Sequence, residues 1–259
     1  MVLYNKANFK HREAISLNLL QKLLKRQEEP RSLCSAVIVA AGRASRMGGI
    51  DKILCPMANE PLLLHTLRPF QASEAVDEIV IVTSEERMVE VGALCSNHGI
   101  TKVKRIVKGG ATRTESVQAG LKETDKAAGI IAIHDGARPF VTMDIIETAI
   151  RTARERGAAA PAIPVKDTIK RAVDGVITET PDRSQLFAVQ TPQVFDADLI
   201  KGAIAKAIAD KAVLTDDCSA VERLGFPVCL TEGSEENIKI TTPADLLHGE
   251  AILEGRETL

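Results

Sequence analysis

Apolar residues along this chain come in short unbroken runs that alternate with longer segments of helical spacing. The first run, residues 36–39, reads AVIV and leads directly into small residues, which is typical of a strand buried on both faces of a parallel sheet. Further strands are expected at residues 78–83, 103–107, 129–134 and 158–165. Helices are expected between them, at residues 62–70, 85–98, 114–124 and 144–156. This alternation predicts an α/β fold with a doubly wound, mostly parallel, Rossmann-like sheet and helices on both faces.

The pattern changes after residue 165. Two short runs, residues 167–172 and 175–180, alternate polar and apolar positions, and Asp174-Gly175 between them is a strong hairpin signal. A hairpin with so little apolar surface is not stable alone, so residues 163–190 are expected to project as a β-arm and pair with another chain. Later elements are expected as helices at 197–211 and from 215–220, strands at 228–230 and 237–241, and a C-terminal helix.

Residues 1–32 differ from the rest of the chain. Leucines with roughly helical spacing lie among Lys, Arg and Gln, and the pattern ends at Pro30. We expect a helical extension packed on the domain, or a partly disordered tail, and assign it no function. Residues 33–259 are expected to form one domain that includes the arm.

Composition narrows the functional classes. Of the 259 residues, 45% are apolar and 26% are charged, as in ordinary globular proteins. A net charge of −2 without a basic surplus disfavours nucleic acid as the main partner. The five cysteines are scattered without a C-x-x-C pair, which indicates reduced thiols. No apolar run approaches the roughly 18 residues needed to span a membrane, and no signal peptide is recognisable, so a cytoplasmic location is expected.

Small residues and two cations follow the first predicted strand. Ala40-Ala41-Gly42 leaves no side-chain bulk where that strand ends, so backbone N–H groups can approach a ligand closely. Arg46 and Lys52 follow on the same loop and could hold a polyphosphate, although a plain turn with two solvated cations would look the same. Neither the Walker pattern nor the G-x-G-x-x-G dinucleotide fingerprint is present.

Two further clusters follow predicted strands, at the end of the sheet where ligands bind in such folds. Gly109-Gly110 precedes a helix start that includes Ser116, and a helix N-terminus favours an anion. Asp135 follows the strand at 129–134. In a chain that binds triphosphate such a carboxylate is the natural Mg²⁺ ligand, and Arg138 could pair with it or with phosphate. Alone, each cluster could equally be a capped turn, and His134 alone is better explained as a core or supporting histidine.

Taken together, these blocks resemble the 2-C-methyl-D-erythritol 4-phosphate cytidylyltransferase family of non-mevalonate isoprenoid synthesis. The resemblance covers the chain from about Ser35 to the C-terminus. The matching blocks, in order, are AAGRASRMG, GGATRTESV, HDGARPF, PVKDTIKR, DRSQLFAVQTPQVF, TDDCSAVE and GSEENIKITTPADL. The resemblance implies a nucleotidyltransferase dependent on Mg²⁺, or on another hard cation such as Mn²⁺. It would convert CTP and methylerythritol phosphate to 4-diphosphocytidyl-2-C-methyl-D-erythritol and pyrophosphate, as a homodimer interlocked by the arm.

The same resemblance implies roles for particular residues. Asp135 would hold the metal, and Arg138 would help to fix that loop in the nucleotide site. The other nucleotide-site residues would be Ala40, Ala41, Gly42, Arg46, Lys52, Gly110 and Ser116. The alcohol-phosphate site would take Thr168, Arg183, Thr191, Thr215 and Lys239, with Thr168 and Arg183 serving the partner's active site. Arg46, Lys52 and Lys239 would be the catalytic cations that stabilise charge at the α-phosphate.

The chain departs from the family pattern around Lys52, which follows Arg46 by one residue fewer than usual. Asp51 also replaces the common proline, and Ile53 the common glutamine, so this loop can close differently. A ribitol- or glycerol-phosphate cytidylyltransferase is an alternative, although HDGARP and PVKDTIKR favour methylerythritol phosphate. A catalytically silent nucleotide-binding homologue is a second alternative, and the retained Arg46, Asp135 and Lys239 count against it. An NAD-binding dehydrogenase is disfavoured by the missing fingerprint.

Overall fold

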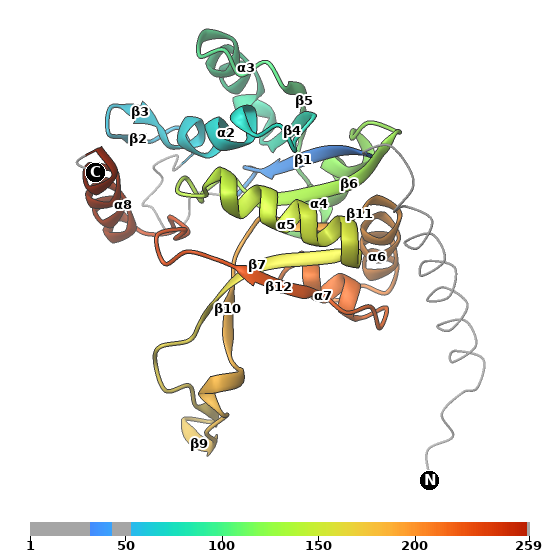
Figure 1. Cartoon of the computed structure of the whole chain (residues 1–259), viewed down its shortest axis with the longest axis vertical. Helices are drawn as coiled ribbons and strands as arrows, with labels where there is room; N and C mark the ends of the chain where they lie inside the picture. Colours follow the sequence, from blue (N-terminus) through green and yellow to red (C-terminus); the bar gives the residue numbers. More distant parts are fainter. Residues whose placement is uncertain (1–31, 43–52, 258–259) are drawn as a thin grey trace.

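The computed structural model of the chain describes residues 32–42 and 53–257 (Figure 1). An eight-stranded mixed sheet forms its centre, with strand order β10-β7-β11-β6-β1-β4-β5 and with β12 paired to β7. The strands are β1 (Leu33–Val39), β4 (Glu78–Thr83), β5 (Val103–Lys108), β6 (Ala128–Asp135), β7 (Ala158–Pro164), β10 (Phe187–Val189), β11 (Gln193–Asp196) and β12 (Cys229–Glu232). Strands β6, β1, β4 and β5 pair in parallel, whereas β11 is antiparallel to both of its neighbours. The predicted mostly parallel sheet is confirmed.

Helices cover both faces of this sheet because successive residues of its strands point to opposite sides. Ala36 and Ile38 of β1 pack in one apolar cluster, while Val37 between them packs in the other. The first cluster includes residues of α2 (Leu62–Ala72), α3 (Met88–Asn97) and α5 (Met143–Arg156). The second includes residues of α4 (Arg113–Lys122), α6 (Ala197–Ala209) and α7 (Asp217–Glu222).

Three loops meet at one end of the sheet because neighbouring parallel strands end in register. Val39 of β1 lies opposite Asp135 of β6, and Thr83 of β4 lies opposite Lys108 of β5. Backbone hydrogen bonds extend this order beyond the strands, from Gly136 N to Val39 O at 2.9 Å and from Gly109 N to Thr83 O at 2.8 Å. Residues 40–42, which directly follow β1, and the segments that follow β5 and β6 are therefore held side by side.

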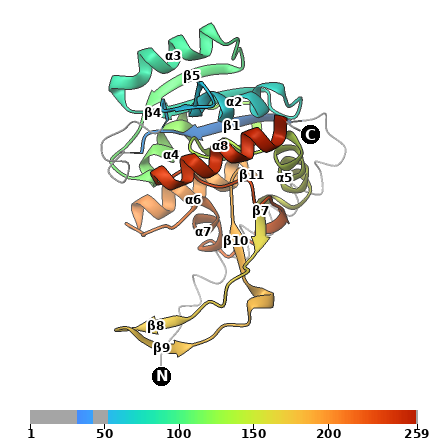
Figure 2. The ribbon, with the colours of Figure 1, turned by 90° about the vertical axis from the view of Figure 1, so that its left-hand side faces the viewer.

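The arm projects from the body of the molecule in both views (Figures 1 and 2). Its tip is an antiparallel hairpin of β8 (Arg171–Val173) and β9 (Val176–Glu179). Asp174 and Gly175 in its turn have φ of 49° and 78°, as a two-residue hairpin turn with left-handed central residues requires. The short 3₁₀ helix η4 (Arg183–Gln185) leads the chain back to β10. The projecting hairpin predicted from Asp174-Gly175 is confirmed.

One predicted strand is wrong. Residues 237–241 form no strand; the segment runs along the end of the sheet and is joined to it by a hydrogen bond from Ile240 N to Ala137 O at 2.8 Å. Its alternating pattern arises because Ile240 packs with Phe140, Leu62 and Met57 in a separate small cluster that includes Ile238. The apolar side of this segment is therefore buried in that cluster, although the segment does not pair with any strand of the sheet.

The remaining elements complete the fold. Strands β10 and β11 were not predicted from the sequence, because they have only three and four residues and are too short to show a period. The segment expected as one helix at 85–98 begins as a 3₁₀ turn, η3 (Glu85–Arg87), before α3. The small hairpin of β2 (Pro56–Met57) and β3 (Glu60–Pro61) and the last helix, α8 (Pro243–Glu257), complete the described chain. None of the helices in residues 32–42 and 53–257 has the length and apolar composition to cross a bilayer.

Candidate active site

A cavity of about 300 Å³ lies where the three loops meet. Its walls come from the ends of β1 and β6, the Gly109-Gly110 turn with the start of α4, and the segment that contains Lys239. Ala40, Ala41, Gly42, Gly110, Ser116, Asp135 and Lys239 all line it, as do Arg113 and Thr112. Seven residues that the sequence analysis selected from separate blocks are thus brought together in one cavity.

The glycine turn is tight because the β1 loop lies directly against it. A Cβ at Gly109 would lie 2.4 Å from the Ala41 Cβ and 2.9 Å from the Ser116 Oγ, closer than van der Waals contact allows. The Ser116 hydroxyl accepts from Gly110 N at 3.1 Å and donates to Thr112 O at 2.9 Å. Ser116 therefore fixes the turn, and only small residues on both sides leave the cavity open.

Helix α4 begins at the cavity wall and has a well-formed N-terminus. The Thr112 hydroxyl accepts from Glu115 N at 3.1 Å, and the Glu115 carboxylate accepts from Thr112 N at 3.0 Å. This reciprocal capping box stabilises the helix start. The next residue, Arg113, is thereby held at the first position of the helix, with its guanidinium on the cavity wall.

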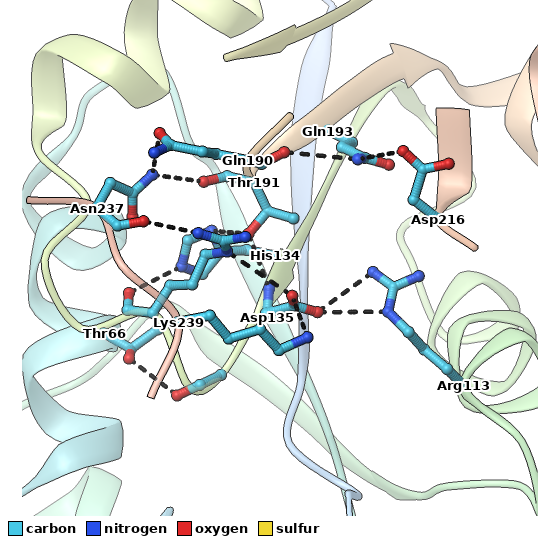
Figure 3. A network of polar contacts seen from close by, with 12 residues as sticks. Thr66, Arg113, His134, Asp135, Gln190, Thr191, Gln193, Asp216, Asn237 and Lys239 are labelled. Atoms are coloured by element: carbon cyan, nitrogen blue, oxygen red, sulfur yellow. Dashed lines mark hydrogen bonds and ion pairs between the residues drawn. The ribbon is translucent and has the colours of Figure 1, made fainter. Parts of the chain in front are cut away.

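Asp135 is the electrostatic centre of the cavity (Figure 3). Its Oδ2 lies 2.7 Å from Lys239 Nζ and 3.8 Å from Arg138 Nε, and its Oδ1 lies 3.3 Å from Arg113 Nη2. Burial would raise the pKa of this carboxyl, but Arg113 and Lys239 outweigh it and hold the pKa well below its usual range. Asp135 is therefore a carboxylate that stays ionised among three cations.

A buried histidine and a threonine fix the position of Asp135. The Thr191 Oγ1 accepts from Asp135 N at 3.1 Å and lies 2.9 Å from His134 Nδ1. His134 Nε2 lies 3.1 Å from Arg138 O, and a carbonyl can only accept, so Nε2 has the proton and Nδ1 accepts from Thr191. Burial lowers the pKa of His134 to about 4. This neutral imidazole supports the loop and is turned away from the cavity chemistry.

Lys239 lies on an irregular segment, yet its backbone is fixed on both sides. Asn237 is fully buried, and its side-chain amide donates to Thr191 O and to Gln190 Oε1, each at 3.1 Å. The Asn237 carbonyl accepts from Arg138 Nη1 at 2.6 Å. On the other side Ile240 is buried and bonded to Ala137 O. The ammonium is therefore presented to Asp135 by a rigid stretch of chain.

Comparison with known proteins gives the family. Residues 34–255 match the family model described as IspD: 2-C-methyl-D-erythritol 4-phosphate cytidylyltransferase. The chain belongs to the IspD family. A protein of that name from Halalkalibacterium halodurans is 46% identical over 224 residues, covering 86% of this chain and 98% of the relative. The one from Alkaliphilus metalliredigens is 42% identical over 229 residues, with coverages of 87% and 95%.

Solved structures agree with this assignment. The 4-diphosphocytidyl-2C-methyl-D-erythritol synthase from Anaerococcus prevotii has a TM-score of 0.79 at 30% identity, covering 86% of this chain and 96% of its own. The 2-C-methyl-D-erythritol 4-phosphate cytidylyltransferase from Thermus thermophilus has a TM-score of 0.70 at 29% identity, with coverages of 84% and 98%. The resemblance inferred from seven sequence blocks is confirmed by these matches.

Other residues predicted for an IspD site lie elsewhere or outside the described chain. Arg46 and Lys52 lie outside the described residues. Thr168 and Arg183 are exposed on the arm and do not line this chain's cavity. Thr215 is exposed just before α7. Thr191 is 4% exposed and its hydroxyl is engaged with His134 and the Asp135 backbone, which gives it a positioning role in this structure.

Two site residues were not selected from the sequence. Arg113 pairs with Asp135 and, at 2.8 Å, with Asp217 Oδ2. Arg113 directly follows a helix cap, Thr112, which is a signal that could have found it. Asp217 lies 104 positions from Arg113, so no local pattern connects them. Both residues do lie in blocks that resemble the family: Arg113 is in GGATRTESV, and Asp217 is in TDDCSAVE.

Proposed function

We propose that this chain transfers a cytidylyl group from CTP to 2-C-methyl-D-erythritol 4-phosphate, releasing pyrophosphate. Membership of the IspD family supports the reaction, and the charged cavity between the β1 loop, the glycine turn and Asp135 supports its location. A phosphate oxygen of the alcohol forms a bond to the α-phosphorus of CTP as the bond from that phosphorus to the bridging β-phosphate oxygen breaks. Pyrophosphate leaves with the electron pair, and 4-diphosphocytidyl-2-C-methyl-D-erythritol remains.

No covalent enzyme intermediate is needed, because the attacking group is already an anionic oxygen. The chain must bring two anions together, so positioning and charge neutralisation account for most of the catalysis. The open glycine turn and the start of α4 accommodate the nucleotide, since backbone N–H groups there can face an anion. Lys239 supplies a fixed positive charge beside Asp135, at the point where both phosphates would meet.

The donor set at Asp135 fits Mg²⁺, which takes one or two protein carboxylates and completes its shell with phosphate oxygens and water. Asp135 is the one acidic side chain among the described residues that line the cavity, and it stays ionised. No cluster of three or more His, Cys, Asp or Glu side chains suited to a metal occurs in the part of the chain that the structure describes, which agrees with a cation held mainly by substrate. When bound, the cation would neutralise charge on the triphosphate.

Pyrophosphate release measures the proposed reaction directly. Purified protein with CTP and Mg²⁺ should release pyrophosphate when methylerythritol phosphate is added, and not when ribitol 5-phosphate is added. Mg²⁺ removal by a chelator should abolish release, and Mn²⁺ should restore it. Release with ribitol 5-phosphate alone would overturn the acceptor, and the absence of release with either acceptor would overturn the activity.

The glycine turn offers a test of the nucleotide site. Gly109→Ala should weaken CTP binding at least tenfold, because the added methyl group must push apart Ala41 and Ser116, which both line the cavity. Calorimetric titration with CTP measures this affinity. Gly202→Ala is the matched control, since it adds the same methyl group to an exposed position of α6 with nothing within 4 Å. The control should keep CTP affinity and gain about 1 kcal/mol of stability. Equal CTP affinity in Gly109→Ala would place the nucleotide elsewhere.

We also propose that the arm forms a homodimer. Ile169, Val173, Val176 and Ile177 are exposed on it, the last two at 67% and 59%, although the sequence suggested a mainly polar hairpin. Such apolar side chains on a thin hairpin indicate a surface that another chain covers. Thr168 and Arg183, on the same arm and remote from this chain's cavity, would then contribute to the partner's active site.

A charge on the arm should prevent this association. Val176→Asp should convert the dimer to a monomer of 27.9 kDa, because an unpaired carboxylate would be buried at the interface. Light scattering after size exclusion gives the mass. Val213→Asp, at a valine 96% exposed and off the arm, should remain dimeric. A wild-type monomer, or a dimeric Val176→Asp, would contradict the assignment of the arm.

A further inference from the structure

Arg113 lies between the carboxylates of Asp135 and Asp217, and it binds them unequally; Figure 3 shows its contacts with Asp135. Its Nη1 and Nη2 donate to Asp217 Oδ1 and Oδ2 at 2.9 and 2.8 Å, which is a bidentate charge-assisted pair of normal length. Its Nε and Nη2 both point at Asp135 Oδ1, each at 3.3 Å, beyond the usual range for such bonds. Arg113 is therefore anchored on Asp217 and only weakly engaged with Asp135.

The anchor itself is rigid. Asp217 is the first residue of α7 and is 1% exposed. The Gln193 side chain holds that helix end, because its Oε1 accepts from Asp217 N at 2.9 Å and from Cys218 N at 3.0 Å. The neighbouring Asp216 instead caps α7, since its carboxylate accepts from Ser219 N at 2.9 Å. The same Gln193 side chain donates through Nε2 to Asp216 Oδ2 at 2.9 Å, so Gln193 and Asp216 together fix the helix end that presents the Asp217 carboxylate to Arg113.

We propose that Asp217 is a positioning residue that holds Arg113 back from Asp135, so that the Oδ1 of Asp135 remains available to a divalent cation. This proposal rests on the metal assignment in the proposed function. Lys239 already engages Oδ2 at 2.7 Å, so Oδ1 is the oxygen with the weaker contacts. Without Asp217, a shift of a few tenths of an ångström would bring two guanidinium N–H groups into normal hydrogen bonds with Oδ1. A cation would then have to displace an ion pair before it could bind.

Direct metal binding tests this role without relying on turnover. Electron paramagnetic resonance of Mn²⁺, titrated with a non-hydrolysable CTP analogue present, gives the dissociation constant of the ion. Asp217→Asn should weaken Mn²⁺ binding about tenfold or more, which is the usual effect of losing a group that orients a metal ligand. Asp144→Asn is the matched control, because it makes the same change in the first turn of a helix, α5, at an exposed position that does not line the cavity; its Mn²⁺ affinity should stay within about twofold.

The double variant Arg113→Gln/Asp217→Asn separates a positioning role from a merely structural one. Removing the competing guanidinium as well should restore Mn²⁺ affinity to within about threefold of wild type, whereas structural damage would persist or grow. If Asp217→Asn does not fold, the single variant Arg113→Gln tests whether the guanidinium competes with the cation for Asp135. Its Mn²⁺ affinity should then equal or exceed that of wild type.

The outcomes distinguish this proposal from the one on which it rests. Failure of wild-type protein to bind Mn²⁺ with the analogue would overturn the metal assignment, and this inference with it. Normal Mn²⁺ binding by wild type together with unchanged binding by Asp217→Asn would overturn the role of Asp217 alone. Weaker binding by Arg113→Gln would also overturn it, since Arg113 would then support the metal. Affinity for the analogue without metal, measured for each variant, corrects for any contact between Arg113 and the nucleotide.

Discussion

Asp135→Asn should lower kcat for pyrophosphate release by about 10³-fold or more. Charge stabilisation by a bound cation is worth several kcal/mol, and each 1.4 kcal/mol is a factor of ten in rate. The amide keeps the shape of the side chain, and the backbone N–H still donates to Thr191, but the one carboxylate among the described cavity-lining residues is lost. Arg113, Arg138 and Lys239 would then face one another without the anion that separates them.

Steady-state kinetics over a range of Mg²⁺ concentrations measures this effect. Asp144→Asn is the matched control, because it makes the same change at an exposed position in the first turn of α5, away from the cavity. The control should keep its kcat and lose less than about 1 kcal/mol of stability. A thermal melt of Asp135→Asn establishes that it is folded. A kcat within tenfold of wild type in a folded Asp135→Asn would remove Asp135 from the centre of the reaction.

The fold was largely predictable because a strand that is buried on both faces appears in the sequence as an unbroken run of apolar residues. The run of residues 36–39 has no polar position, since Ala36 and Ile38 meet one helical layer and Val37 the other. Residues 237–241 show the limit of such arguments. Their alternation matches a strand, yet Ile240 is buried against Phe140 and Leu62 in a cluster outside the sheet. Periodicity indicates that a face is buried, but the partner that buries it is decided by tertiary packing.

A site residue could be predicted where the signal for it, such as the end of a predicted strand, lies in the same short segment as the residue itself. Asp135 ends a buried strand, β6, and Gly110 lies two residues after β5, so the topology of a parallel sheet brings them together. The Arg113–Asp217 pair has no such cue, because its members meet only through the packing of α4 and α7 on the same face of the sheet. Thr191 illustrates a third case: its block was recognised, but its burial behind Asp135 is a tertiary fact.

Lys239→Ala should lower kcat by about 10²–10³-fold, which is the usual loss for one preorganised charge or donor at a reacting centre. Its ammonium lies 2.7 Å from Asp135 Oδ2, and the buried Asn237 and Ile240 on either side keep the backbone in place. The change therefore removes a charge without removing the segment that presents it. Because the proposed role of Lys239 is to neutralise charge where the two phosphates meet, the loss should appear in kcat more than in the KM for CTP.

Lys206→Ala is the matched control for this lysine. Lys206 also pairs with an aspartate, Asp210 at 3.0 Å, but on the exposed surface of α6, where such pairs contribute a few tenths of a kcal/mol. Its kcat should equal that of wild type. Comparing the two variants separates the loss of a lysine–aspartate pair from the loss of a charge in the cavity. Near-normal turnover in Lys239→Ala would place the cation that balances the phosphates elsewhere in the chain, whereas a rise in KM alone would limit Lys239 to substrate binding.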